Sequence, residues 1–101
     1  MRFLSRLFQR LSPRRMFHAT GVRPMGANAL VVVIEDRTYW MHAQLHPGRP
    51  PEYRVWTSDI RDITSAATVV AAPPASGRIV PEIQRRIGSY AEQSGARVSY
   101  H

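Results

Sequence analysis

Residues 29–45 of the chain, ALVVVI-EDR-TYWMHAQL, decide its fold. The first six are all apolar and four of them are β-branched, a composition typical of a strand that is buried on both faces. The next three predict a turn, and the last eight alternate between apolar and polar side chains. We expect this alternation to place Trp40 and His42 on the face opposite Met41. The two runs together predict a β-hairpin.

The residues that follow predict a third antiparallel strand. The segment at 46–51, HPGRPP, breaks regular structure. Alternation resumes over residues 52–57, with Arg54 and Trp56 on the face opposite Val55. The sequence therefore predicts a three-stranded antiparallel meander.

The C-terminal half has weaker strand signals and one clear helix signal. Residues 58–64 fit a turn or a short helical segment, and residues 67–72 fit a fourth strand. An apolar stripe with helical spacing over residues 79–93 predicts a helix, which Gly95 ends. Residues 96–100 alternate again and predict a last strand.

These elements predict an α+β fold in one small domain. We expect a small antiparallel sheet of three to five strands, a C-terminal helix packed on one face of it, and an N-terminal amphipathic helical arm. Residues 1–26 would form the basic arm and a linker, the linker running from Thr20 to Ala27. Residues 27–101 would form a single α+β domain.

The charge of the chain is concentrated towards its N-terminal end. All fourteen basic residues are arginines, and the formal net charge is +7. Residues 1–34 hold six arginines and no acidic residue, whereas residues 35–101 hold eight arginines and seven acidic residues. We therefore expect a basic arm on a body that is close to neutral. The absence of cysteine excludes disulfides, thiolate metal sites and cysteine nucleophiles, and with them a secreted disulfide-bonded protein.

The arm has the pattern of an amphipathic helix over residues 2–12, which ends before Pro13. A helix of this length is marginal in water by itself, so it needs a surface to lie on. Three surfaces remain open: the protein's own body, an anionic membrane, or an organelle import receptor. The apolar stripe consists of Phe3, Leu4, Leu7, Phe8 and Leu11, and the basic side of Arg2, Arg6 and Arg10.

The import alternative has one further support. Arg15, Phe17 and Thr20 resemble the two-step processing signature of mitochondrial precursors, in which an arginine, a bulky apolar residue and a Ser, Thr or Gly follow one another at this spacing. In a eukaryote we therefore expect a mitochondrial or membrane-peripheral location. In a bacterium or its phage we expect a cytoplasmic one.

One face of the predicted sheet lacks a cover. The strand at 29–34 needs apolar cover on both faces, and a single C-terminal helix covers only one. Either the arm covers the other face or a partner does, and in the second case the face is an aromatic patch with polar groups around it. The candidate partner face consists of Trp40, His42, Arg54 and Trp56.

Signals for catalysis and for metal binding are weak. No phosphate loop, nucleophile elbow or zinc motif is present. His42 and His46 would lie on one strand face at about 13 Å from each other, too far apart to share a metal. Asp59 and Asp62 with His42 are the remaining hydrolytic candidate, although carboxylates beside arginine are more often ion-paired. We expect no catalytic residues, no metal and no cofactor.

Two functions from different classes follow. The first is a non-enzymatic accessory subunit or adaptor, which the arm directs to a membrane surface, an organelle or a larger assembly and which docks on protein. The second is a nucleic-acid-binding protein, such as an organellar ribosomal or phage-encoded factor. It would use Trp40 and Trp56 for stacking on bases. Phosphate or anionic-surface contacts would come from Arg14, Arg15 and Arg23.

Overall fold

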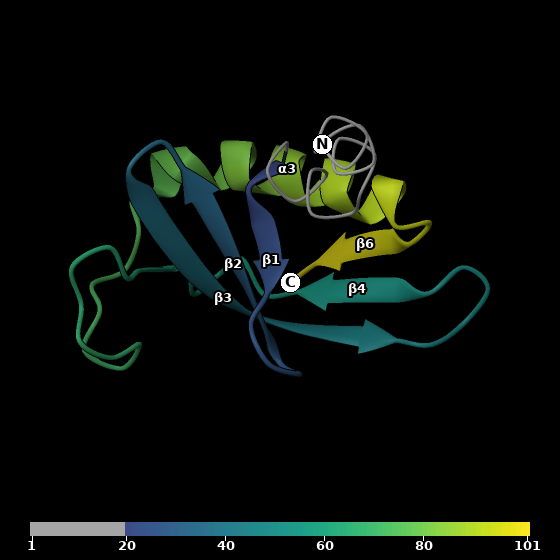
Figure 1. Cartoon of the computed structure of the whole chain (residues 1–101), viewed down its shortest axis with the longest axis horizontal. Coiled ribbons are helices and arrows are strands. Elements are labelled where there is room, and N and C mark those ends of the chain that lie inside the picture. The colour runs from purple at the N-terminus through teal and green to yellow at the C-terminus, as the bar shows by residue number, and fades with distance from the viewer. Residues whose placement is uncertain (1–19) are drawn as a thin grey trace, which may run out of the picture.

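The computed structural model describes residues 20–101 of the chain. The predicted arm helix over residues 2–12, together with Arg14 and Arg15, lies outside the described residues. The described part contains six strands, one α-helix and a short 3-10 turn (Figure 1). In chain order they are β1 (Val22–Pro24), β2 (Ala29–Ile34), β3 (Arg37–His46), β4 (Glu52–Val55), β5 (Arg61–Asp62), η1 (Gly77–Ile79), α3 (Val80–Gln93) and β6 (Arg97–Tyr100).

The strands form one mixed sheet in the order β1-β2-β3-β4-β6, with β5 paired to β3. The predicted hairpin is confirmed as β2 and β3, which are antiparallel with Val31 opposite Trp40. β3 is long enough to hold β2 on one edge and both β4 and β5 on the other. The fold is therefore α+β, as the sequence predicted, with the C-terminal helix in place.

The prediction of a purely antiparallel sheet was wrong, whereas the expected three to five strands are exceeded only by the two-residue β5. β6 pairs with β4 in parallel, with Val55 opposite Tyr100. The reason is the helix: α3 carries the chain back along the sheet between these two strands, so β6 starts from the same end as β4. The sequence predicted the helix and a strand after it, but it did not specify the strand with which this last strand pairs.

A further strand, β1, lies within the segment predicted as a linker. It pairs with the outer edge of β2, with Val22 opposite Val32. Gly21 leads into it at a φ of 73° and accepts a hydrogen bond from the Val33 amide at 2.8 Å. A Cβ at Gly21 would lie 2.4 Å from the Val33 carbonyl oxygen, so only glycine fits this approach. Three residues that include a proline carry too little alternation to be recognised as a strand.

The segment between β4 and α3 also differs from the prediction. Residues 58–64 form turns, one of the two predicted alternatives, but the turns lie on either side of the short strand β5 (Arg61–Asp62), which was not predicted. Residues 67–72 form turns rather than a fourth strand, and the Val70 side chain is 90% exposed. β5 already occupies the free edge of β3, and Arg61 bridges to Pro74, so no strand edge remains there for residues 67–72.

The hydrophobic core lies between α3 and one face of the sheet. α3 begins with Pro81 in its first turn and is followed by Gly95 at a φ of 72°. No helix in residues 20–101 is long and apolar enough to cross a membrane. The fully buried side chains of the core are Val22, Leu30, Val32, Met41, Val55, Ile83 and Ile87.

Candidate binding face

The second face of the sheet turns away from α3 and has no helix on it within residues 20–101. α3 packs on the opposite face (Figure 1), and the long segment between β4 and α3 loops out beyond one end of the sheet. We call this second surface the open face. Because side chains alternate along a strand, its members follow from the pairing registers. They are Arg23, Ala29, Val31, Val33, Thr38, Trp40, His42, Gln44, His46, Glu52, Arg54, Trp56, Arg61, Arg97, Ser99 and His101.

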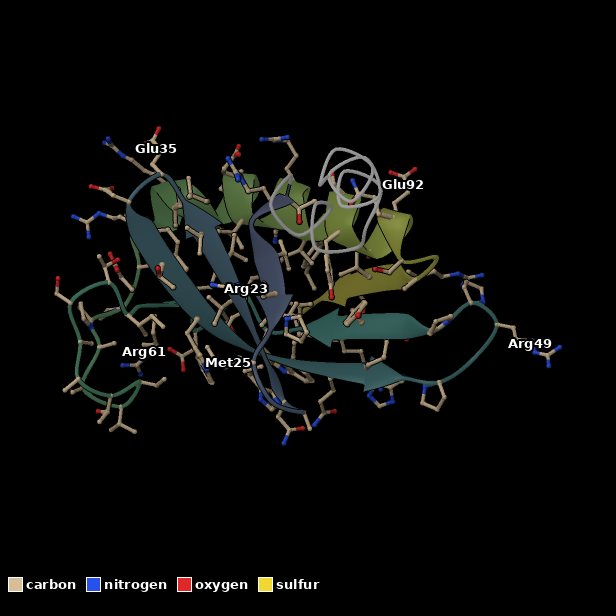
Figure 2. The ribbon with its side chains drawn as sticks, in the orientation of Figure 1. Arg23, Met25, Glu35, Arg49, Arg61 and Glu92 are labelled. Atoms are coloured by element: carbon tan, nitrogen blue, oxygen red, sulfur yellow. The ribbon has the colours of Figure 1, made fainter. Side chains whose placement is uncertain are left out.

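One row of the open face crosses four strands and has an arginine at each end. Arg23 on β1 is opposite Val31, Val31 is opposite Trp40, and Trp40 is opposite Arg61 on β5. Figure 2 labels the two terminal arginines. The Arg61 guanidinium is held by Asp59 at 2.9 Å and donates to the Ala72 carbonyl at 2.9 Å. The Arg23 side chain is exposed and makes no ion pair within residues 20–101.

A second row consists of three rings. The Trp56 amide donates to the His42 carbonyl at 2.9 Å, which places Trp56, just after β4, beside His42 on β3. The Trp56 and His42 ring centroids are 4.7 Å apart, with the rings tilted by 51°. On the other side of Trp56, the His101 ring stacks at 5.2 Å with an interplanar angle of 27°. Trp56 therefore lies between two imidazoles, and one of them stacks on it.

Two further rows lie towards the β3–β4 turn. Gln44 pairs with Arg54, and Arg54 with Ser99. In the next row, Glu52 lies between His46 and Arg97. Hydrogen bonds from Ser99 and then Arg54 lower the pKa of the Glu52 carboxyl from its ordinary value. The His46 Nε2 atom is buried and has no hydrogen-bond partner within residues 20–101.

The rows separate the charges of the folded part. Four arginines lie on the open face (Arg23, Arg54, Arg61 and Arg97) against two carboxylates, those of Glu52 and Asp59, which pair with Arg54 and Arg61. The other charged residues between 20 and 101 are five arginines and five carboxylates. The excess positive charge of the folded part thus lies on the open face, although along the chain the two signs are interspersed.

The structure brings together all four residues predicted for a partner face. Trp40, His42, Arg54 and Trp56 lie on the open face, and Arg23, which the sequence grouped with the arm, joins them. Trp40 and Trp56 are on the same face but not in the same row, because the register places Trp56 beside His42 rather than beside Trp40. His101 was missed, since only the parallel pairing of β6 with β4 places it beside Trp56.

The hydrolytic candidate is not assembled. Asp62 lies opposite Tyr39, on the side of the sheet away from His42, and pairs with Arg37 at 2.8 Å. Asp59 pairs with Arg61. No group of three residues that could hold a metal ion occurs within residues 20–101. These carboxylates are used in ion pairs, as the pattern of carboxylates beside arginines indicated.

A small apolar depression of about 280 Å³ is the other surface feature. Its lining residues include Pro24, Leu30, Ala43, Leu45 and Tyr53, so it lies at the end of β1. Leu45 is one of the exposed large aliphatic side chains of the described part, with Val70 in the β4–α3 segment and Met25 just after β1. Comparison of the chain with protein-family models, curated proteins and solved structures found no significant match.

Proposed function

We propose that this chain is a non-enzymatic binding protein, an accessory subunit or adaptor of a larger assembly, and that the open face is its contact surface. The observation that carries the proposal is the composition of that face. Both tryptophans of the chain lie there, each partly exposed, on a sheet surface that no helix covers within residues 20–101. Aromatic residues and arginine are the side chains most enriched at the energetic centres of interfaces.

The charge of the open face favours an anionic partner. Two copies of the face would each bring four arginines and two carboxylates, so they would repel one another. The arm is an equally poor match, because residues 1–19 contain five arginines and no acidic residue. A partner that carries carboxylates or phosphates complements the face.

The arm has a separate role in this proposal. Its apolar stripe and arginines would direct the chain to an anionic membrane, an organelle or the assembly itself. The full chain should bind vesicles that contain anionic lipid, and a Leu7→Asp variant should bind more weakly, because the substitution interrupts the stripe. Equal binding by both chains would show that charge alone attracts the arm.

The contact surface is tested by retrieval of partners from the native host. The face variant Arg23→Glu/Arg97→Glu reverses two exposed arginines of the open face. The control Arg49→Glu/Arg78→Glu makes the same charge change at two exposed arginines elsewhere, one in the β3–β4 turn and one in η1. The face variant should lose partners that the wild-type chain and the control retain. Equal retrieval by all three chains would place the contact surface elsewhere.

A second candidate function, nucleic-acid binding, is favoured by one specific observation, the segregation of arginine on the aromatic face. Nuclease treatment of the same extracts separates the two functions. Partners that withstand nuclease are held through protein, whereas partners that disappear are held through RNA or DNA.

A further inference from the structure

We infer that the ligand of the open face is single-stranded nucleic acid, an inference that rests on the proposed role of this face as the contact surface. Single strands offer both chemistries that the face complements. Their unpaired bases stack on aromatic rings, and their phosphates pair with guanidinium groups. In a duplex the base faces are already stacked, so the aromatic groups of the open face would have nothing to bind.

The accessible side chains of the open face distinguish this ligand from an acidic protein. The aliphatic side chains in the middle of the face, Ala29 and Val31, are 8% and 2% exposed and offer little surface for binding. Apolar surface remains at the β1–β2 edge, where Val33 is partly exposed and Met25, whose amide donates to the Ala29 carbonyl, is 51% exposed. Around the two tryptophans the accessible groups are indole, imidazole, amide and guanidinium, whereas the centre of a protein–protein interface is more apolar.

The ring contacts define where bases can stack. Trp56 lies between His42, whose ring is tilted by 51° against it, and His101, whose ring stacks on it, so Trp56 is the middle of a ring cluster rather than an open platform. His101 is exposed, and it follows β6, which pairs only with β4 in the described sheet. A base can therefore extend this ring cluster by stacking on the outer side of His101. Trp40 makes no ring contact within residues 20–101 and provides the second stacking position.

The arginines lie where the phosphates of such a strand would pass. Arg23 and Arg61 end the row that contains Trp40. Arg54 and Arg97 lie in the rows next to the His42–Trp56–His101 ring cluster. Each stacking position thus has guanidinium groups beside it, the combination that proteins use to bind single strands without strong sequence preference.

Intrinsic fluorescence tests the inference directly, because both tryptophans of the chain are on the open face. Titration of the full chain with an oligothymidylate should quench the fluorescence. Trp40→Ala should weaken binding roughly 5- to 150-fold, the effect of removing one base stack, and Trp40→Phe should retain most of the affinity. Circular dichroism of each variant checks that the fold is intact.

A base-free polyanion separates stacking from charge. Polyphosphate should bind Trp40→Ala as well as it binds the wild-type chain. The Arg23→Glu/Arg97→Glu variant should bind the oligonucleotide more weakly than Arg49→Glu/Arg78→Glu does. It should also show a shallower salt dependence, by about 0.7 in log–log slope for each phosphate that it no longer neutralises.

Three results would overturn the inference. They are an absence of quenching, an equal decrease of polyphosphate and oligonucleotide binding in Trp40→Ala, and binding of poly-glutamate with the affinity and variant dependence of the oligonucleotide. If in addition the face variant still loses nuclease-resistant partners from host extract, the contact surface stands and its partner is an acidic protein. If the face variant loses no partner, the proposed contact surface fails as well.

Discussion

The two faces of the sheet are made by the same strands and have opposite characters. On the covered face, Met41 and Val55 are fully buried against the helix residues Ile83 and Ile87. On the open face, their neighbours Trp40 and Trp56 remain partly exposed among arginines and histidines. Residues one position apart in the chain thus serve folding on one side and, in the proposed function, recognition on the other. Paired substitutions at adjacent positions can therefore separate stability from binding.

The largest contrast is expected between Met41 and Trp40 on β3. Met41→Ala leaves a cavity in the core and should lower the free energy of unfolding by about 2–5 kcal/mol. Trp40→Ala removes a larger side chain but one that is partly in solvent, and we expect a decrease of about 1 kcal/mol. Urea denaturation of the full chain measures both. If the two decreases are equal, the open face is covered in the isolated chain, and the contrast between the faces breaks down.

A smaller contrast is expected between Tyr100 and Ser99 on β6. The Tyr100 hydroxyl donates a 2.7 Å hydrogen bond to the Gln84 carbonyl of α3, and burial raises the pKa of this tyrosine. Tyr100→Phe removes the hydrogen bond that links β6 to the helix and should reduce stability by about 1 kcal/mol.

The Ser99 hydroxyl lies on the other side of the same strand, 3.3 Å from the Nε2 atom of His101, in an exposed setting. Ser99→Ala should change stability by less than about 0.5 kcal/mol, because water can replace the partners of an exposed hydroxyl. Thermal melts compare this variant with Tyr100→Phe, and a larger effect of Ser99→Ala would contradict the assignment of the faces.

The smallest effect concerns pH and the carboxylate of Asp62, on the covered side at the edge strand β5. Hydrogen bonds from Thr64 and then the charge of Arg37 lower the pKa of Asp62. A lowered pKa in the folded state stabilises the fold above the unfolded-state value of about 4, and this stabilisation is lost as the pH falls through the folded-state value.

Asp62→Asn should therefore be less stable than the wild-type chain at pH 7, by less than about 1 kcal/mol. The difference should shrink as the pH is lowered below about 4. Urea denaturation at pH 7 and at about pH 3 measures it. A difference that stays constant over this range would show that the carboxylate charge contributes nothing to the fold. Glu52→Gln on the open face is the matched control, since the Glu52 pKa is also lowered, but at a more exposed position than that of Asp62.

The amino-acid sequence by itself determined the local elements of the folded part. These elements have local signals: the apolar run of β2, the alternation along β3 and β4, and the apolar stripe of α3. Each signal can be read from residues that are close in the chain, within one or two helical turns or a few strand residues. For the same reason the sequence placed Trp40 and Trp56 on the side of their strands away from the core. It also predicted that Arg54 and His42 lie on the same face as the two tryptophans.

Only the tertiary structure decided which strands lie side by side. The pairing of β4 with β6 brings together residues 44 positions apart, such as Thr57 and His101, and no local pattern specifies such a partner. This pairing places His101 against Trp56, and that of β5 with β3 places Arg61 beside Trp40. The charge distribution also depends on strand pairing. The four arginines of the open face come from four different strands, so this face has an excess of positive charge only when those strands are aligned in the sheet. Register and strand order depend on the burial of the whole sheet against α3, which is a property of the assembled core rather than of any one segment.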